Sequence, residues 1–214
     1  LHWQKKWGKG RFNALVGATF QHQESKDLGL AASNFPSNNQ ILNLSAADEV
    51  AITSDGASEY RYQAVFGRLN FKWDDRYIIN LTGRRDGSSR FGPGRQFGNF
   101  GAVGGAWLFS KEAFLKDSDI LSFGKLRSSY GITGSDGIPN YGFYDSYETS
   151  GSSYDGPVLE ATGLFNPDFG WEENKKFEAA LELGFFQDRI FVTAAWYRNR
   201  SSNQLVGIPL AETT

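Results

Sequence analysis

The sequence offers few residues of the types that catalysis or metal binding requires. Its 214 residues include two histidines and no cysteine, which argues against thiol chemistry and against zinc sites. His2 and His22 stand alone in the chain and are interpreted as polar residues at strand ends. Glu172 and Glu173 are adjacent, so on a strand they point to opposite faces and cannot share acid–base work. We therefore expect no catalytic residue, no metal, no cofactor and no enzymatic activity.

Aromatic residues gather in the segment 135–171 and are better candidates for ligand contact. Aromatic faces stack on sugar rings and also pack well in protein interfaces. We take Tyr141, Tyr144 and Tyr147 as candidate binding residues, within the larger set Tyr141, Phe143, Tyr144, Tyr147 and Tyr154. The alternative is that these rings only pack the segment onto itself.

Four arginines surround a glycine-rich segment. Gly92–Gly94 lacks the spacing of a phosphate-binding loop, and a predicted strand rather than a helix follows it. Arg90 and Arg95 are candidate contacts for an anionic or hydroxyl-rich ligand, in a set that comprises Arg84, Arg85, Arg90 and Arg95. The competing interpretation is a set of salt bridges to carboxylates of the same protein.

The elements that would position these residues are β-strands. Alternation of apolar and polar residues predicts strands at 11–23, 60–73, 77–85, 99–109, 123–133, 176–185 and 189–200. The last of these has two mixed faces, so its orientation stays open. Leu1 falls in what reads as a polar turn.

The predicted connections alternate in length. Those at 74–76 and 187–189 are tight, and 110–122 is longer, with a helical turn or two expected at Lys111–Leu115. Long polar connections are expected at 24–59, 86–98 and 135–171. Short turns at one end and long loops at the other are typical of an outer-membrane barrel.

Composition narrows the class of protein further. The net charge of −2 gives no basic face for nucleic acid, and no apolar run is long enough for a membrane-spanning helix. A spanning strand needs only about 9–11 residues, half of them polar. Alternation alone fits a soluble β-sandwich equally well. The asymmetry of the connections favours the barrel, as do the aromatic residues beside the short turns, Trp73, Tyr77, Trp107 and Phe185.

Several motifs in series resemble the SusC/RagA type of TonB-dependent transporter. Arg84–Gly92 reads RRDGSSRFG, and Phe66–Phe71 is similar to the family's FGRLNY strand. Lys125–Gly134 resembles KLRASYGxTG. The resemblance continues through Asn166–Asp168 with Trp171–Glu172, the stretch 186–200, Pro209–Leu210 and Thr213–Thr214. Departures are Ser135, where the family often has Asn, and Ala211–Glu212.

The resemblance implies an all-β, antiparallel transmembrane β-barrel segment: about seven strands of a larger barrel of about 22, with short periplasmic turns and long extracellular loops. Residues 1–214 would be a partial barrel domain, without the plug domain and both barrel ends.

The implied function is TonB-dependent import of oligosaccharides or oligopeptides across the outer membrane of a Gram-negative bacterium. Implied partners are a SusD-like surface lipoprotein, the TonB complex acting on the plug, the glycan or peptide ligand, and outer-membrane lipid. The alternatives are a passive porin or adhesin barrel, and a soluble carbohydrate-binding β-sandwich.

Overall fold

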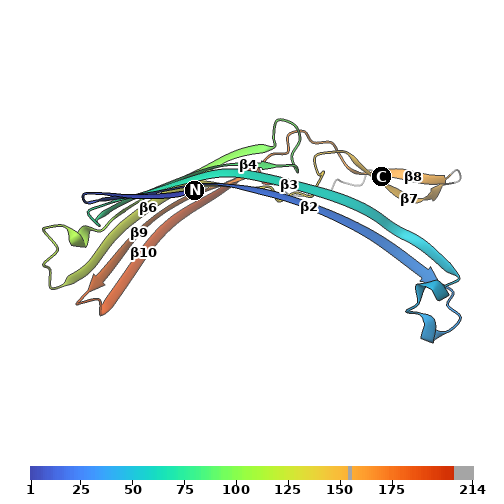
Figure 1. Ribbon diagram of the computed structural model, residues 1–214, viewed down its shortest axis with the longest axis horizontal. Helices are drawn as coiled ribbons and strands as arrows, with labels where there is room; N and C mark the ends of the chain where they lie inside the picture. Colours follow the sequence, from blue (N-terminus) through green and yellow to red (C-terminus); the bar gives the residue numbers. More distant parts are fainter. Residues whose placement is uncertain (154–155, 205–214) are drawn as a thin grey trace, which may run out of the picture.

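The computed structural model describes the backbone of residues 1–153 and 156–204. It describes the side chains of residues 1–147 and 161–204. Eight strands form one sheet in the order β1-β2-β3-β4-β5-β6-β9-β10, and β7 pairs with β8 in a separate hairpin. The sheet is arched along its strands (Figure 1). Its strands are β1 (His2–Trp7), β2 (Gly10–Ser33), β3 (Glu49–Trp73), β4 (Tyr77–Ser88), β5 (Phe97–Trp107), β6 (Leu121–Ser135), β9 (Glu172–Phe185) and β10 (Ile190–Ser202).

The remaining elements are short. The hairpin consists of β7 (Ser146–Ser153) and β8 (Gly156–Gly163). Single 3-10 turns are η1 (Asn38–Gln40), η2 (Leu44–Ala46) and η3 (Phe109–Lys111). Within the described ranges, no helix has the length and apolar character needed to cross a membrane.

All neighbouring strands of the sheet are antiparallel, so the connections fall at two opposite ends (Figure 1). We call these the turn end and the loop end. The turn end holds the connections β1–β2, β3–β4, β5–β6 and β9–β10, and the loop end holds β2–β3, β4–β5 and β6–β9. The connections alternate between these two ends as predicted, but the turn-end connection 108–120 is longer than the loop-end connection 89–96.

The turn between β3 and β4 shows how the sequence sets the turn end. Asp74 and Asp75 have φ of 51° and 53°, and the amide of Arg76 donates to the carbonyl of Trp73 at 3.0 Å. Positive φ at both central residues is the type I′ geometry, whose twist matches that of paired strands, and aspartate tolerates it better than most residues.

The seven predicted strands are confirmed, and the sheet has an eighth. The prediction of a polar turn around Leu1 is wrong, because His2–Trp7 pairs with β2 from His2↔Leu15 to Trp7↔Gly10. Lys5 and Lys6 made this segment look like a turn.

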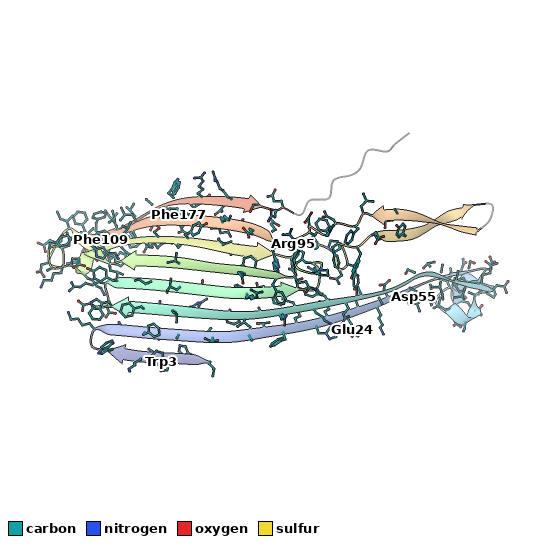
Figure 2. The ribbon with its side chains drawn as sticks, turned by 90° about the horizontal axis from the view of Figure 1, so that it is seen from above. Trp3, Glu24, Asp55, Arg95, Phe109 and Phe177 are labelled. Atoms are coloured by element: carbon teal, nitrogen blue, oxygen red, sulfur yellow. The ribbon has the colours of Figure 1, made fainter. Side chains whose placement is uncertain are left out.

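The long connection predicted at 24–59 is mostly strand. β2 and β3 stay paired out to Ser33↔Glu49, with one irregularity between Gly29 and Leu30. They project past the other sheet strands as a two-stranded arm that carries Glu24 and Asp55 (Figure 2). At about 3.3 Å per residue, a strand as long as β2 spans roughly 80 Å. Apolar and polar side chains no longer alternate regularly along this arm. Its two strands are paired through backbone hydrogen bonds, which do not require an apolar pattern.

The other long connections are also partly ordered. β4 continues to Ser88 and β5 begins at Phe97, so the loop predicted at 86–98 is shorter. The segment 135–171 contains the β7–β8 hairpin. The predicted helical turn at Lys111–Leu115 is displaced: the 3-10 turn covers Phe109–Lys111, and a tight turn follows, in which the Leu115 amide donates to the Glu112 carbonyl at 3.0 Å.

The register assigns every sheet residue to one of two faces. The face we call outer contains Phe71, Leu69, Ile79 and Leu81, which are direct cross-strand partners. Its apolar side chains are exposed in a continuous band across the sheet: Val16, Val65, Leu69, Phe71, Ile79, Leu81, Val103, Leu126, Tyr130, Phe177, Leu181, Val192 and Trp196. An apolar surface of this extent needs a cover, and the hydrocarbon of a membrane supplies it.

The opposite, inner face carries charged pairs at the same level. Lys125 lies directly across from Glu182, with its Nζ 3.2 Å from the carboxylate. Arg127 contacts Glu182 at 2.9 Å and Glu178 at 2.5 Å. These ion pairs lie on the face turned away from lipid, where a charge does not have to enter hydrocarbon.

The aromatic residues predicted beside the short turns form a row. Trp73 pairs with Tyr77, and Tyr77 pairs with Trp107. Phe185 lies at the same end, opposite Ile190. Such a row is the geometry of an aromatic girdle at a membrane surface.

Pairing also settles the orientation of β10. Trp196 faces Ala179 and packs edge-on against Phe177 at 5.6 Å between ring centroids. Ile190, Val192, Ala194 and Trp196 therefore belong to the outer face, and Tyr197 to the inner face.

Candidate functional site at the loop end

A small apolar core at the loop end fixes the segments that carry the candidate residues. Phe91, from the RRDGSSRFG motif, is completely buried among Phe100, Ile138 and Trp171. Its ring lies 5.2 Å from that of Trp171. Full burial of such a side chain contributes about 1.5–3 kcal/mol. The core thereby joins the β4–β5 loop, β5 and the two ends of the β6–β9 connection.

Phe100 fits into this core because two glycines leave room for its ring. A Cβ added to Gly98 would lie 2.5 Å from the Cζ atom of Phe100, and one added to Gly134 would lie 1.9 Å from it. Only hydrogen side chains permit this approach. The glycine of the KLRSSYGITG motif is thus part of the core packing.

Asp136 is the centre of a polar network beside that core. Its carboxylate accepts hydrogen bonds from the hydroxyls of Tyr60, at 2.8 Å, and Ser88, at 2.7 Å. Ser88 is buried, with 3% of its surface exposed. The network fastens the start of the β6–β9 connection to the middle of β3 and the end of β4.

Burial and this carboxylate change the acidity of Tyr60, which lies beyond the apolar band. Burial, followed by the hydrogen bond to Asp136, raises the pKa of the Tyr60 phenol to about 12. The phenol therefore stays protonated and keeps donating to Asp136 throughout the physiological pH range.

Arg90 is held inside this network. Its Nε donates to the side-chain oxygen of Asn140 at 3.0 Å, and its guanidinium donates to the backbone carbonyl of Asp136 at 3.0 Å. The guanidinium also lies over the ring of Tyr60, 4.3 Å from the centroid, a favourable cation–π geometry. Of the two readings of Arg90, the geometry favours the internal structural one.

Arg95 is placed differently. It is half exposed and contacts the carboxylate of Asp168 at 3.0 Å. Both residues line an open cavity of about 670 Å³, together with Trp171, Glu173 and neighbours from β5 and the segment after β10. Arg95 lies near the loop end of the sheet (Figure 2), and its contact with Asp168 is a salt bridge of the kind that the competing interpretation predicts.

The two other arginines of the set have partners on the strands. The Nε of Arg84 lies 2.8 Å from a carboxylate oxygen of Asp86, and its guanidinium donates to the hydroxyl of Tyr62 at 2.7 Å. These three residues line a second open cavity of about 760 Å³ on the inner face. Arg85 faces outward, donates to Asn99 at 3.2 Å and lies over Phe97.

The candidate tyrosines lie at the surface of the loop end. Tyr141, Tyr144 and Tyr147 are 47%, 51% and 58% exposed. The Tyr141 hydroxyl accepts from the amide of Glu59 on β3 at 3.0 Å, and Tyr144 packs on the buried ring of Phe143 at 4.0 Å. Tyr141 and Tyr144 are thus positioned by protein contacts yet keep exposed aromatic surface. Tyr154 lies outside the described residues, as does the segment 205–214.

His22, interpreted as isolated, has neighbours in the structure. Its Nε2 lies 2.7 Å from a carboxylate oxygen of Glu59 and 3.5 Å from one of Glu24. The three side chains come close enough to share a cation. Arg61 already lies 2.5 Å from the same Glu59 carboxylate, so that carboxylate has a cationic partner within the protein.

Sequence reasoning missed Tyr60, Asp136, Asp168 and Trp171 as members of this region. The contact between Tyr60 and Asp136 joins residues 76 positions apart in the sequence. A local sequence pattern does not predict a contact over that separation. The one sequence signal for this core is the tryptophan of the Trp171–Glu172 motif, which indicates the family but does not by itself indicate which residues pack against it.

Comparison with known proteins agrees with these features. The family described as TonB dependent receptor-like, beta-barrel matches residues 1–214. TonB-dependent receptor P3 of Formosa agariphila is 30% identical over 218 residues, covering 99% of this chain and 22% of the relative. TonB-dependent receptor SusC of Bacteroides thetaiotaomicron is 36% identical over 132 residues, covering 58% of this chain and 13% of the relative.

Solved structures show the same arrangement of strands. The RagAB peptide transporter superposes with a TM-score of 0.87 at 27% identity, over 98% of this chain and 24% of that one. The RagAB peptide importer in its open-open state gives a TM-score of 0.84. The chain spans about a quarter or less of the length of the proteins it matches. It belongs to the TonB-dependent receptor β-barrel family, in its SusC/RagA type.

Proposed function

We propose that the full-length protein imports oligosaccharides or oligopeptides across the outer membrane of a Gram-negative bacterium, with energy from TonB acting on a plug domain elsewhere in that protein. The observation that carries the proposal is the family match over the entire chain. Relatives described as SusC and as a peptide transporter leave both ligand classes in play. The role of this chain is to form part of the barrel wall and part of its outer loops.

The two faces of the sheet suit that role. The outer face presents the apolar band to lipid, and the inner face presents charged and polar groups to an aqueous lumen. The inner cavity, with Arg84, Asp86 and Tyr62, offers both signs of charge and a phenol hydroxyl, which suits ligands rich in hydrogen-bonding groups. We infer that this part of the barrel wall contributes to transport by binding ligands non-covalently and not by catalysing a reaction.

Two other functions compete with energised import: carbohydrate binding by a soluble β-sandwich, and passive passage or adhesion by a barrel without energy coupling. The described residues form one eight-stranded sheet rather than the two stacked sheets of a sandwich. A passive porin or adhesin remains the competitor, because energy coupling depends on parts of the protein outside this chain.

Uptake of labelled oligosaccharides and oligopeptides by cells expressing the full-length protein tests the proposal, with TonB present or deleted. We expect uptake of one ligand class to disappear with TonB. Uptake that persists without TonB would replace energised import with passive passage, and uptake of neither class would overturn the import proposal.

We further propose that the exposed tyrosines at the loop end contact a SusD-like surface lipoprotein or the arriving ligand. Tyr141, Tyr144 and Tyr147 present rings that stack on sugars or pack in an interface. Replacing all three with alanine should reduce uptake and co-purification of the lipoprotein. The matched control replaces all three with phenylalanine, which keeps the rings and removes only the hydroxyls. Unchanged uptake and co-purification in the alanine variant would reject this role.

A further inference from the structure

Arg90 belongs to a short segment that is anchored on both sides of it. Before Arg90, the amide of Ser89 donates to the carbonyl of Arg61 on β3 at 2.9 Å, and the Ser89 hydroxyl accepts from the Arg61 amide at 2.9 Å. After Arg90, Phe91 is completely buried in the apolar core at the loop end. The backbone of Arg90 is therefore fixed, and a contact made by its guanidinium positions the partner.

The partner of that guanidinium is the segment 136–144, which follows β6. Nε of Arg90 donates to the side chain of Asn140, and Nη1 donates to the backbone carbonyl of Asp136, each at 3.0 Å. The planar fork of a guanidinium is suited to two acceptors at once. One side chain thus holds the segment at two points, while the ring of Tyr60 lies against the guanidinium.

Tyr141 follows Asn140 directly, and its backbone has a φ of 63°, in the left-handed region. This conformation is unfavourable for a residue with a Cβ and persists where the surroundings fix it. Arg90 holds the preceding residue, and the Tyr141 hydroxyl accepts from the amide of Glu59 at 3.0 Å. Glu59 lies on β3 beyond the last residue pair with β4, so no β4 carbonyl is available to this amide.

Tyr144 is positioned by the same segment. Its amide donates to the carbonyl of Tyr141 at 2.9 Å. Phe143, the residue before it, is buried, and the Phe143 carbonyl accepts from the amide of Asn166 at 3.0 Å. The placement of both tyrosines therefore depends on how the segment 136–144 is docked, and Arg90 is the residue of the RRDGSSRFG motif that docks it.

We propose that Arg90 is a positioning residue for ligand capture, because it holds the segment 136–144 and thereby Tyr141 and Tyr144. This inference rests on the proposed contact between these tyrosines and the arriving oligosaccharide or oligopeptide. Tyr60 and Asp136, which anchor the segment, also line the cavity of the inner face, so the segment borders the path of a ligand into the barrel. Docking before the ligand arrives strengthens binding, because the ordering has already taken place.

Hydrogen exchange of the full-length protein in detergent tests the docking. A hydrogen bond from a charged donor corresponds to about a tenfold change in an equilibrium, so Arg90→Gln should lower the protection factors of residues 136–144 by about that factor. Arg85→Gln is the matched control. Arg85 also donates to an asparagine and lies over an aromatic ring, but both partners, Asn99 and Phe97, are on β5. Its variant should keep these protection factors within about twofold.

Uptake kinetics test the consequence for the ligand. The probes are a labelled starch hydrolysate and a labelled tryptic digest of casein, given to cells that express the full-length protein. Apparent affinity falls with the fraction of protein in the binding-competent state, so Arg90→Gln should raise KM at least about threefold and leave the maximum rate within about twofold. In a background with Tyr141→Ala and Tyr144→Ala, Arg90→Gln should add no further increase, because it acts through these two rings.

Asn140→Ala tests the same contact from the other side. It removes the acceptor of the Arg90 Nε and leaves Arg90 in place, so it should lower the protection factors and raise KM even if Arg90→Gln folds poorly. Unchanged protection factors in both variants would overturn the role of Arg90 alone, whereas import of neither mixture by the unaltered protein is the failure of the proposed function. Lower protection with unchanged KM, an equal rise of KM in Arg85→Gln, or a further rise in the background without the tyrosines would also overturn the inference.

Discussion

The carboxylate of Glu112 accepts a hydrogen bond from the indole nitrogen of Trp107 at 3.0 Å. The same carboxylate accepts from the hydroxyl of Tyr77 at 2.7 Å and from the guanidinium of Arg76 at 3.1 Å. Glu112 belongs to the connection between β5 and β6, outside the strands. It therefore ties this connection to two aromatic residues of the turn-end row and to the β3–β4 turn.

This arrangement predicts acid sensitivity at the turn end. The hydrogen bond from Tyr77, then that from Trp107, holds the pKa of Glu112 below its ordinary value of 4.5. A carboxyl group whose pKa is lowered by folding adds stability above its unfolded pKa, and that stability is lost as the pH falls through the lowered folded pKa. We expect the protection factors of residues 108–120 against hydrogen exchange, which correct for the pH dependence of the intrinsic rate, to fall below about pH 4.5.

Glu112→Gln is the matched variant for this prediction. The amide keeps the shape of the side chain but does not titrate. The segment should therefore have lower protection factors than in the unaltered protein at pH 7, and these should change little on acidification. If the protection factors of this segment in the unaltered protein are equal at pH 7 and pH 4, the three donors do not stabilise the ionised carboxylate.

Packing at the loop end predicts that adding one methyl group at Gly134 lowers the stability of the folded barrel. Gly134→Ala would place its Cβ 1.9 Å from the ring of Phe100, and Phe100 is packed against Trp171 at 5.3 Å. Overpacking of this kind costs about 1–3 kcal/mol. We expect a lower unfolding temperature, measured by the heat-dependent change in electrophoretic mobility of the folded barrel.

Gly83→Ala is the control for the packing prediction. Gly83 is also in a strand, but a Cβ there meets nothing within 4 Å, so its unfolding temperature should stay close to that of the unaltered protein. Equal behaviour of the two variants would show that Phe100 moves aside without cost.

The assignment of the two faces of the sheet predicts that a charged substitution destabilises the barrel on the outer face much more than at the neighbouring position on the inner face. Leu81 belongs to the apolar band of the outer face, and Thr82 lines the inner cavity. Leu81→Arg should destabilise the folded barrel by about 2–4 kcal/mol if it lies near mid-depth in the membrane. Thr82→Arg should change the free energy much less, because its side chain enters water.

Urea unfolding of the full-length protein in lipid vesicles measures both free energies. Similar losses for Leu81→Arg and Thr82→Arg would contradict the assignment of the outer face to lipid.

The local pattern of residues determined much of the fold. Alternation along 60–73 and 77–85 defined which side chains share a face, because a strand's side chains repeat every two residues. It also placed Trp73 and Tyr77 beside a short turn. The serial motifs identified the family, because their order and spacing along the chain are more specific than any single motif.

Tertiary structure decided the features that depend on a partner strand. The strand 189–200 has two mixed faces, and only its pairing with β9 assigned Trp196 to the outer face. The arm formed by β2 and β3 was hidden in the sequence, because beyond the lipid both faces meet water and no apolar pattern is required.

The loop end shows the same division. The sequence singled out Arg90 and Tyr141 by residue type, but it gave no indication that Arg90 would be held by Asn140 and the Asp136 carbonyl. Contacts between segments this far apart arise from the order in which strands pair. A sequence thus determines the period of each strand and, where alternation is clear, its two faces. The sheet decides the faces of the other strands, which side chains become neighbours and which remain free for a ligand or for lipid.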